Sequence, residues 1–168
     1  MRKLAMLVSV LSLFSTGWAQ QKINPDSIRS KMQWFGDAKL GIFIHWGMYS
    51  VNGIGESWSF HNREIGYSDY MKQMQGFTAS KYDPARWASL IKESGARYAV
   101  ITTKHHEGMA LWPTKQNHLN VVKNTPAGRD LLAPFYKELD KQGIKRGAYF
   151  SLIDWSWKLR LGGIFRLT

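Results

Sequence analysis

The chain has 168 residues, of which 44% are hydrophobic and 14% are aromatic, and its formal net charge is +11 at pH 7. This composition gives enough apolar side chains for a packed core and argues against intrinsic disorder. The positive charge is spread along the chain without a basic cluster or a nucleic-acid-binding motif, so nucleic acid is not an expected partner. The sequence contains no cysteine, which excludes disulfides and a lipidated cysteine within these residues.

The first 19 residues have the pattern of a secretory signal peptide. Arg2 and Lys3 precede an apolar stretch over residues 4–14, and the small residues Gly17 and Ala19 occupy the positions that a signal peptidase reads. We therefore expect cleavage after Ala19 and a secreted or periplasmic protein. The apolar stretch is shorter than a membrane span, and no later segment has about 18 consecutive apolar residues, so no membrane anchor is expected.

The next segments are a polar lead-in and a first strand. Residues 20–33 are mostly polar, and Asn24, Pro25 and Asp26 predict a turn or the start of a helix there. An apolar strand is predicted over residues 39–47, near the end of which stands His45. A single histidine at such a place is more typical of a structural residue than of a functional one.

Residues 47–80 show neither helical nor strand periodicity and are interrupted by glycines, which predicts a long excursion from the sheet. Loops of this length in compact domains commonly carry function. Glu56 and Trp58 lie within the excursion, and a carboxylate beside an indole suits a sugar, whose C–H faces stack on aromatic rings while its hydroxyls need fixed partners. The alternative is that Trp58 fills a small core of the excursion itself.

Two amphipathic helices are predicted further along the chain. Asp83 and Pro84 indicate a capped helix start, and Trp87, Leu90 and Ile91 share one face that we expect in the core. The second helix has Pro134 in its first turn and carries an apolar stripe made of Leu131, Leu132, Phe135, Tyr136 and Leu139. Gly95 and Gly143 are the expected ends of the two helices.

Each helix leads into a predicted strand, over residues 97–103 and 146–153, so the order of elements is β-α-β-α-β. Residues 98–101 are apolar throughout, as in a strand that is covered on both faces of a parallel sheet. The Gly-rich phosphate loop of dinucleotide-binding folds is absent. We therefore predict an α/β fold of about three β/α units, the N-terminal portion of a (β/α)8 TIM barrel that is incomplete as given.

Polar residues gather where the second strand ends. The strand ends in Thr102 and Thr103 and is followed by Lys104, His105, His106 and Glu107. The carboxyl ends of parallel strands form the edge at which α/β folds bind ligands. Because His45 stands at the end of the preceding strand, histidine recurs at successive strand ends. This repetition predicts a binding site at that edge, with a sugar as the first hypothesis.

A different interpretation makes His45, His105 and His106 ligands of a metal ion in a barrel hydrolase, since imidazole suits Zn²⁺. Adjacent residues on an extended strand point to opposite faces, so His105 and His106 would hold one ion only if the chain turns there. The His-x-His pattern typical of metal barrels is also absent. We therefore expect neither a metal nor a cofactor, and metal analysis with a chelator control would test this expectation.

With these motifs, the chain resembles the N-terminal part of the family 29 glycoside hydrolases, the retaining α-L-fucosidases, from about residue 34 to residue 155. The resemblance rests on five blocks in the order of the family: residues 40–47 (LGIFIHWG), 77–87 (FTASKYDPARW), 102–112 (TTKHHEGMALW), 128–131 (GRDL) and 149–152 (YFSL). It implies a fucose pocket whose substrate-binding residues are His45, Glu56, Trp58, His105, His106 and Tyr149.

The same resemblance implies that the catalytic nucleophile and the acid/base lie beyond the end of this sequence, so that no residue of the chain is assigned a catalytic role. The expected organisation is a signal peptide at residues 1–19, a polar lead-in at 20–33, a partial catalytic barrel domain at 34–155 and a tail at 156–168 that departs from the family pattern, as an out-of-frame end would.

The expected parent activity is therefore exo-acting, retaining hydrolysis of terminal α-L-fucosyl linkages in fucosylated oligosaccharides or glycoconjugates. The chain itself is expected to be an inactive fragment that keeps part of the fucose pocket. A non-catalytic sugar-binding fragment is the alternative, with millimolar or absent binding of L-fucose because half a pocket encloses a small ligand poorly. The linkage preference and the oligomeric state are left open by the sequence.

Overall fold

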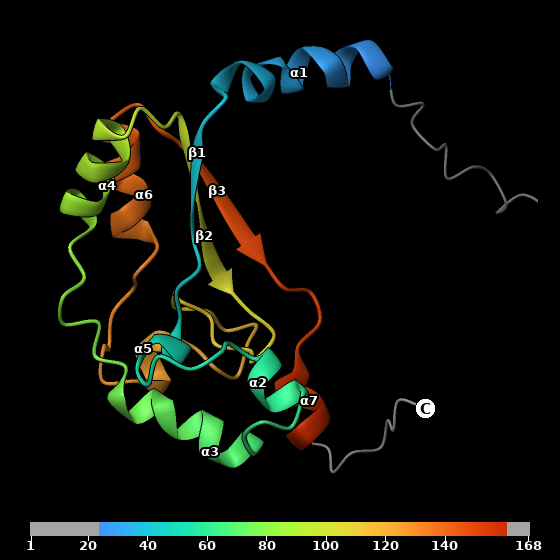
Figure 1. Ribbon diagram of the computed structural model, residues 1–168, viewed down its shortest axis with the longest axis vertical. Helices are drawn as coiled ribbons and strands as arrows, with labels where there is room; N and C mark the ends of the chain where they lie inside the picture. Colours follow the sequence, from blue (N-terminus) through green and yellow to red (C-terminus); the bar gives the residue numbers. More distant parts are fainter. Residues whose placement is uncertain (1–23, 161–168) are drawn as a thin grey trace, which may run out of the picture. The chain divides into compact units, whose positions relative to one another are not determined.

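The computed structural model describes residues 24–160, with side chains through Trp157 (Figure 1). The chain divides into two units between Asp37 and Ala38. In the first unit the structure describes one helix, α1 (Pro25–Ala38), with proline at its first position and Asp26 in its first turn. The predicted signal peptide and residues 161–168 of the predicted tail lie outside the described residues, so these assignments and the predicted localisation stay predictions.

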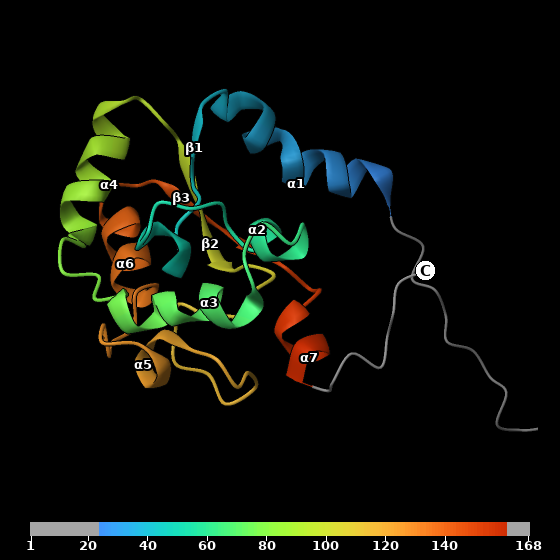
Figure 2. The ribbon, with the colours of Figure 1, turned by 60° about the horizontal axis from the view of Figure 1, so that its bottom comes forward.

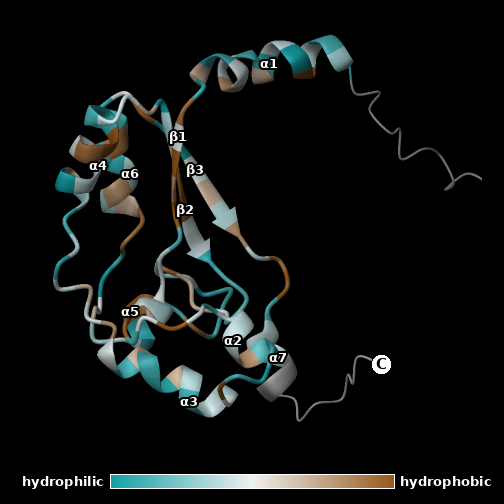
Figure 3. Ribbon diagram, viewed as in Figure 1, coloured by the Kyte–Doolittle hydropathy of each residue, from teal (hydrophilic) through white to brown (hydrophobic). Residues whose placement is uncertain are grey.

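The second unit is built on a parallel sheet of three strands, β1 (Gly41–Ile44), β2 (Tyr98–Lys104) and β3 (Lys145–Phe150), in the order β1-β2-β3. Ile44 pairs with Ile101, which in turn pairs with Ala148, so the three carboxyl ends meet at one edge. The predicted α/β class and the order of elements are confirmed. The hydropathy along β2 changes from hydrophobic to hydrophilic toward this edge (Figure 3).

Two of the strands are shorter than predicted. After β1, the N–H of Trp46 donates to the Thr102 hydroxyl at 2.8 Å instead of to a backbone carbonyl, so the ladder ends before His45. The third strand stops at Phe150 and not at residue 153. The chain leaves the sheet from Ser151 on, because the Ser151 carbonyl accepts a hydrogen bond from the Lys104 ammonium at 2.9 Å.

Helices α4 (Pro84–Glu93) and α6 (Ala133–Lys141) cover one face of the sheet (Figure 1). The Asp83 side chain accepts a hydrogen bond from the N–H of Arg86 at 2.9 Å, which confirms the predicted cap. Fully or nearly fully buried apolar residues fill the space between helices and sheet: Ala88, Ile91, Ala99, Ile101, Leu131, Leu132, Phe135 and Leu139. Pro134 lies in the first turn of α6, as expected.

The expectation that Leu90 belongs to the core is wrong, since its side chain is 46% exposed. The buried positions of α4 are Ala88 and Ile91, which are three residues apart and therefore lie on one face. Leu90 is turned about 100° away from Ile91 around the helix axis and points off this stripe.

The other face of the sheet carries exposed aromatic residues. Phe43 is 53% exposed and Tyr149 is 37% exposed, and their rings meet edge to face with centroids 5.8 Å apart. Both α4 and α6 lie on the opposite side of the sheet (Figure 1). Among the described strands, β1 and β3 each pair with β2 alone, so their outer edges have no strand partner. A face and edges of this kind are buried and paired when a β/α barrel closes.

Short helices gather at the carboxyl ends of the strands (Figure 2). They are η2 (Met48–Ser50), α2 (Trp58–His61), α3 (Tyr67–Met71), η3 (Lys72–Gly76), α5 (Val121–Asn124) and α7 (Trp155–Arg160). Four of them belong to the predicted excursion, whose buried side chains Met48, Phe60, Tyr70 and Phe77 belong to the same hydrophobic core as the residues between the helices and the sheet. Over residues 24–160, none of the helices has the length and hydropathy of a membrane span.

Candidate functional site

The three strand ends bring His45, His105 and Tyr149 together, as the sequence predicts for the carboxyl edge of a parallel sheet. The rings of His45 and His105 have centroids 4.9 Å apart, and the Tyr149 ring stacks on His105 at 5.7 Å. Tyr49, which the sequence analysis does not single out, closes the other side with its ring centroid 5.2 Å from that of His45. Burial raises the pKa of Tyr49 above its ordinary value, so its hydroxyl stays protonated.

Two adjacent threonines hold the outer strand ends against β2. The Thr102 hydroxyl accepts a hydrogen bond from the N–H of Trp46 and donates one to the Trp46 carbonyl at 2.7 Å. The Thr103 hydroxyl donates to the carbonyl of Tyr149 at 2.9 Å. Thr102 thus bonds the chain that follows β1 and Thr103 bonds β3, so one threonine serves each neighbouring strand end. Their role is not apparent from the sequence, where they read as the β-branched end of a strand.

His105 is part of a hydrogen-bonded chain that runs into the excursion. Its Nδ1 lies 2.6 Å from Oγ of Ser57, and the Ser57 hydroxyl donates to Oε2 of Glu56 at 3.2 Å. A hydroxyl that donates to the carboxylate receives its hydrogen bond from Nδ1–H, which leaves Nε2 of the neutral ring as an acceptor. Ser57, which is completely buried, thus links His105 to Glu56. This role of Ser57 is not apparent from the sequence.

Two carboxylates flank the same nitrogen of His105. Oε2 of Glu56 and Oε2 of Glu107 each lie 3.6 Å from Nδ1. The Glu107 side chain is only 2% exposed, and its Oε2 has no hydrogen-bond partner among the described residues. Oε2 of Glu56 also accepts from the N–H of Trp58 at 2.9 Å. Both carboxylates thus act on the orientation of site residues, and the predicted contact of Glu56 with a sugar stays a prediction.

His106 is fixed by a backbone carbonyl of the segment that follows β3. Its Nδ1 lies 2.9 Å from the carbonyl oxygen of Ile153. A carbonyl only accepts, so Nδ1 carries the hydrogen and Nε2 of the neutral ring is an acceptor. The ring also stacks on Trp155 with centroids 4.4 Å apart and an angle of 20° between the planes.

Trp58 is half-exposed beside a stack of three aromatic rings. The rings of His61 and His106 stack on Trp155 at 4.2 Å and 4.4 Å, which makes a stack of three rings with Trp155 in the middle. Trp58 is perpendicular to all three, at 86°, 83° and 81°. It is 46% exposed, whereas Phe60 of the same helix is 8% exposed, so Phe60 and not Trp58 is the core residue of this helix. An exposed indole suits stacking of a sugar ring.

The chain turns directly after β2, which is the condition under which His105 and His106 could share a metal ion. The N–H of Gly108 donates to the carbonyl of His105 at 3.1 Å, and the two imidazole rings lie side by side with centroids 4.8 Å apart. The turn removes the argument from strand geometry against a shared metal ion. Even so, the part of the chain with known placement contains no group of three or more histidine, aspartate or glutamate residues arranged to hold a metal.

His45 is expected to titrate below its ordinary pKa of 6.5. Burial lowers the pKa and the nearby His105 adds to this, whereas Glu56 and Glu107 oppose the shift. The folded chain therefore binds fewer protons than the unfolded chain just below pH 6.5, so the contribution of His45 to stability is complete above that pH and is lost as the pH falls through the folded pKa.

An NMR titration of the labelled imidazole checks this prediction, with the chain unfolded in urea as the reference. The His45 midpoint should lie below the reference and should fall further in Glu56→Gln, which removes an opposing carboxylate. A folded midpoint at or above the reference would contradict the arrangement of charges described here.

The six residues predicted to bind substrate thus lie in one cluster at the carboxyl edge of the sheet. Hydrogen-bonding imidazole and phenol groups beside an exposed indole are the components of a carbohydrate site. Their place at the ends of parallel strands with β/α connections is that of the active site in β/α-barrel enzymes. The fold and the site together place the chain in the class of β/α-barrel enzymes.

The sequence comparisons name the family. A sequence model of the Alpha-L-fucosidase family matches residues 11–163, and the chain belongs to this family. Human tissue alpha-L-fucosidase is 36% identical over 143 residues, which cover 76% of this chain and 31% of the human protein. Alpha-L-fucosidase of Dictyostelium discoideum is 35% identical over 147 residues, with 73% of this chain and 31% of that protein covered.

Solved structures give the same result. The GH29 alpha-L-fucosidase of Bacteroides thetaiotaomicron superposes with a TM-score of 0.68 at 39% identity, over 74% of this chain and 30% of that one. Alpha-L-fucosidase isoenzyme 1 of Paenibacillus thiaminolyticus gives 0.70 at 40% identity, over 76% and 30% of the two chains. The chain therefore spans about a third of the length of the relatives it matches, and its sheet corresponds to part of a TIM barrel.

Proposed function

We propose that the described residues form one wall of the fucose pocket of an exo-acting, retaining α-L-fucosidase, which hydrolyses terminal α-L-fucosyl linkages. The observation that carries the proposal is the cluster of His45, His105, His106 and Tyr149 at the strand ends, with the half-exposed Trp58 beside it. Fucose has vicinal hydroxyls and an apolar C–H face, and this wall offers imidazole nitrogens for the former and an indole for the latter.

A family relative supports the retaining mechanism. The solved structures that resemble this chain include a Bacteroides thetaiotaomicron fucosidase with a trapped covalent intermediate, in complex with 2-fluoro-fucosyl fluoride. A covalent glycosyl-enzyme intermediate belongs to retaining hydrolysis, which needs a nucleophilic carboxylate and a second carboxyl group about 5 Å away. The fucosylated oligosaccharides or glycoconjugates expected as substrates are part of the same proposal.

The carboxylates of the described wall have other tasks. Glu107 is almost completely buried, and Glu56 bonds the Ser57 hydroxyl and the Trp58 backbone. Asp154 faces the Lys104 ammonium at 3.4 Å. We infer that this wall binds and orients the sugar, and that the two carboxyl groups of the reaction come from elsewhere in the intact enzyme.

Titration of the isotope-labelled chain with L-fucose tests the proposal. The ring signals of His45, His105 and His106 should shift with a dissociation constant in the millimolar range, since one wall leaves most of the sugar in water. D-fucose, the mirror image with identical bulk properties, is the matched control and should cause no such shifts. Equal responses to both sugars, or none to either, would contradict a fucose-binding wall, and micromolar affinity would contradict the partial enclosure.

A further inference from the structure

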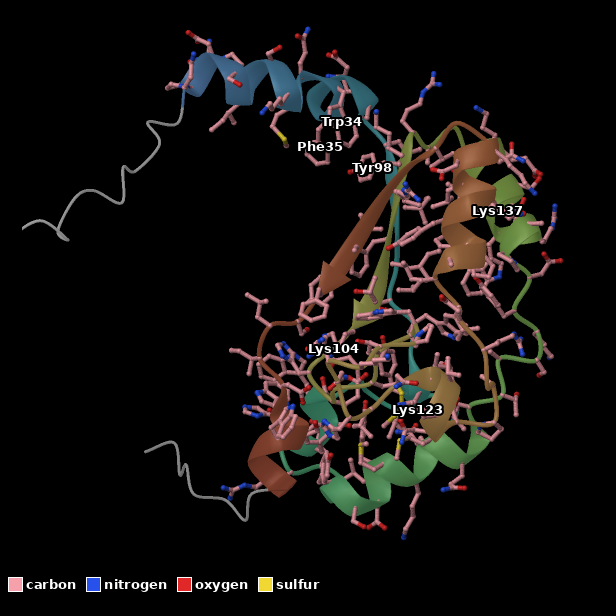
Figure 4. The ribbon with its side chains drawn as sticks, turned by 180° about the vertical axis from the view of Figure 1, so that it is seen from behind. Trp34, Phe35, Tyr98, Lys104, Lys123 and Lys137 are labelled. Atoms are coloured by element: carbon pink, nitrogen blue, oxygen red, sulfur yellow. The ribbon has the colours of Figure 1, made fainter. Side chains whose placement is uncertain are left out.

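One buried cation has no part in the proposed sugar contacts. The Lys104 side chain is 6% exposed, and its ammonium donates to the carbonyl of Ser151 at 2.9 Å. The same nitrogen lies 3.4 Å from Oδ2 of Asp154, whose side chain is 11% exposed, and 4.9 Å from the centre of the Phe150 ring. Figure 4 labels Lys104 close to the carboxyl ends of β2 and β3. A charge this deeply buried is costly unless it is paired, so the geometry of its partners is strongly constrained.

The Asp154 carboxylate is held on its other sides as well. Its Oδ1 accepts from the N–H of Ser156 at 3.0 Å and from the Ser156 hydroxyl at 2.5 Å. Gly108 leaves room for the carboxylate, because a Cβ at this position would lie 2.8 Å and 2.9 Å from the two oxygens. Gly108 also has a φ of +91°, which a side chain would strain. The Asp154 carboxylate is thus fixed relative to the turn that carries the two histidines.

Lys104 contacts the segment after β3 at two residues, one before and one after Ile153 in the sequence. It contacts Ser151 and Asp154, and between these two residues lies Ile153, whose carbonyl accepts the hydrogen bond from Nδ1 of His106. Two backbone hydrogen bonds connect the same segments, from Ser151 to the Lys104 carbonyl at 3.0 Å and from Trp155 to the His106 carbonyl at 2.8 Å. The Lys104–Asp154 ion pair and these two backbone hydrogen bonds together hold the segment that carries the Ile153 carbonyl.

We propose that Lys104 and Asp154 are a positioning pair for His106. The pair holds the Ile153 carbonyl against the imidazole, the carbonyl keeps the hydrogen on Nδ1, and the unprotonated Nε2 is thereby presented as a hydrogen-bond acceptor. That Nε2 accepts from a fucose hydroxyl rests on the proposed function; the control of the tautomer by the ion pair does not. Neither charged group belongs to the proposed sugar contacts, and both act through the backbone of residues 151–156.

The tautomer of His106 in the full chain is the direct readout. Long-range ¹H–¹⁵N spectra of the labelled protein distinguish a protonated from an unprotonated ring nitrogen, and the native chain should show hydrogen on Nδ1 alone in the neutral ring. In the double variant Lys104→Met/Asp154→Asn both charges are removed, so no unpaired charge is left buried and the fold is retained. Its two ring nitrogens should converge in frequency, because both tautomers are then populated.

This double variant separates positioning from simple charge compensation. If the ion pair only balances two buried charges, neutralising both restores the native state, and His106 keeps its hydrogen on Nδ1; that result would overturn the proposal. Asp154→Asn alone is the second variant, since an amide still accepts from Ser156, and it should give the same mixture of tautomers. Lys72→Met is the matched control, because Lys72 pairs with Asp69 on the surface with both side chains mostly exposed, and it should leave the His106 spectrum unchanged.

Binding of L-fucose gives a second readout. The double variant should raise the dissociation constant about tenfold, as expected for the loss of one hydrogen bond to a ligand, while Lys72→Met should not change it. If the unmodified chain fails to bind L-fucose, the proposed function fails, whereas the tautomer experiment still decides the positioning role. An unchanged dissociation constant together with mixed tautomers would overturn the assignment of His106 Nε2 to the sugar.

Discussion

The purified 168-residue chain is expected to release no 4-nitrophenol from 4-nitrophenyl α-L-fucoside above the rate in buffer. Retaining hydrolysis requires two carboxyl groups about 5 Å apart on either side of the anomeric carbon. The described wall supplies imidazoles, phenols and an indole, and its carboxylates are engaged in internal contacts at His105 and Lys104. A chromogenic assay at several pH values measures this directly.

An intact α-L-fucosidase of the same family, assayed under identical conditions, is the positive control. Turnover by the 168-residue chain would contradict the assignment of its carboxylates to positioning roles. In that case Glu56→Gln would identify the group responsible, since Glu56 is the more exposed of the two carboxylates next to His105, with 22% of its side chain accessible against 2% for Glu107.

Replacement of Phe135 by alanine is expected to remove about 3–5 kcal/mol from the free energy of unfolding. The Phe135 side chain is completely buried between α6 and the sheet, and its ring meets the edge of Trp87 at 6.0 Å. A loss of this size is a large share of the roughly 5–15 kcal/mol that stabilises a typical domain. Urea unfolding followed by circular dichroism gives the value.

Phe43→Ala provides the matched control, because it removes the same side chain from a position that is 53% exposed. Its effect should stay below about 1.5 kcal/mol, since much of the ring is already in contact with water. An equal loss in both variants would mean that the open face of the sheet is buried in solution. That result would contradict the exposed face described for the second unit.

Much of the fold could be predicted because its signals are local. Asp83 and Pro84 define a helix start through a cap and a fixed φ, and the alternation of helical stripes with apolar runs predicts the β/α order. The exact ends of strands are set by tertiary contacts instead. β3 ends early because the Ser151 carbonyl is bound by a lysine more than forty residues earlier in the chain, and no local pattern carries this information.

In the candidate site too, some features follow from local sequence signals and others depend on tertiary contacts. The sequence predicts that histidines gather at the carboxyl edge, because parallel strands share their direction. It does not predict which way each ring faces. The tight turn after His105, the link through Ser57 and the stack of His61 on Trp155 all depend on contacts between the excursion and distant segments.

The turn after β2 has a further consequence for the dimensions of the site. In the sheet Ile44 pairs with Ile101, so His105 lies three residues beyond the position that is level with His45. The 4.9 Å between the two ring centroids is therefore set by the turn, which brings His105 back beside His45, and not by the spacing of the strands. Substitutions in this turn are expected to change the interval at which the two imidazoles are offered to a ligand, even where the sheet itself stays intact.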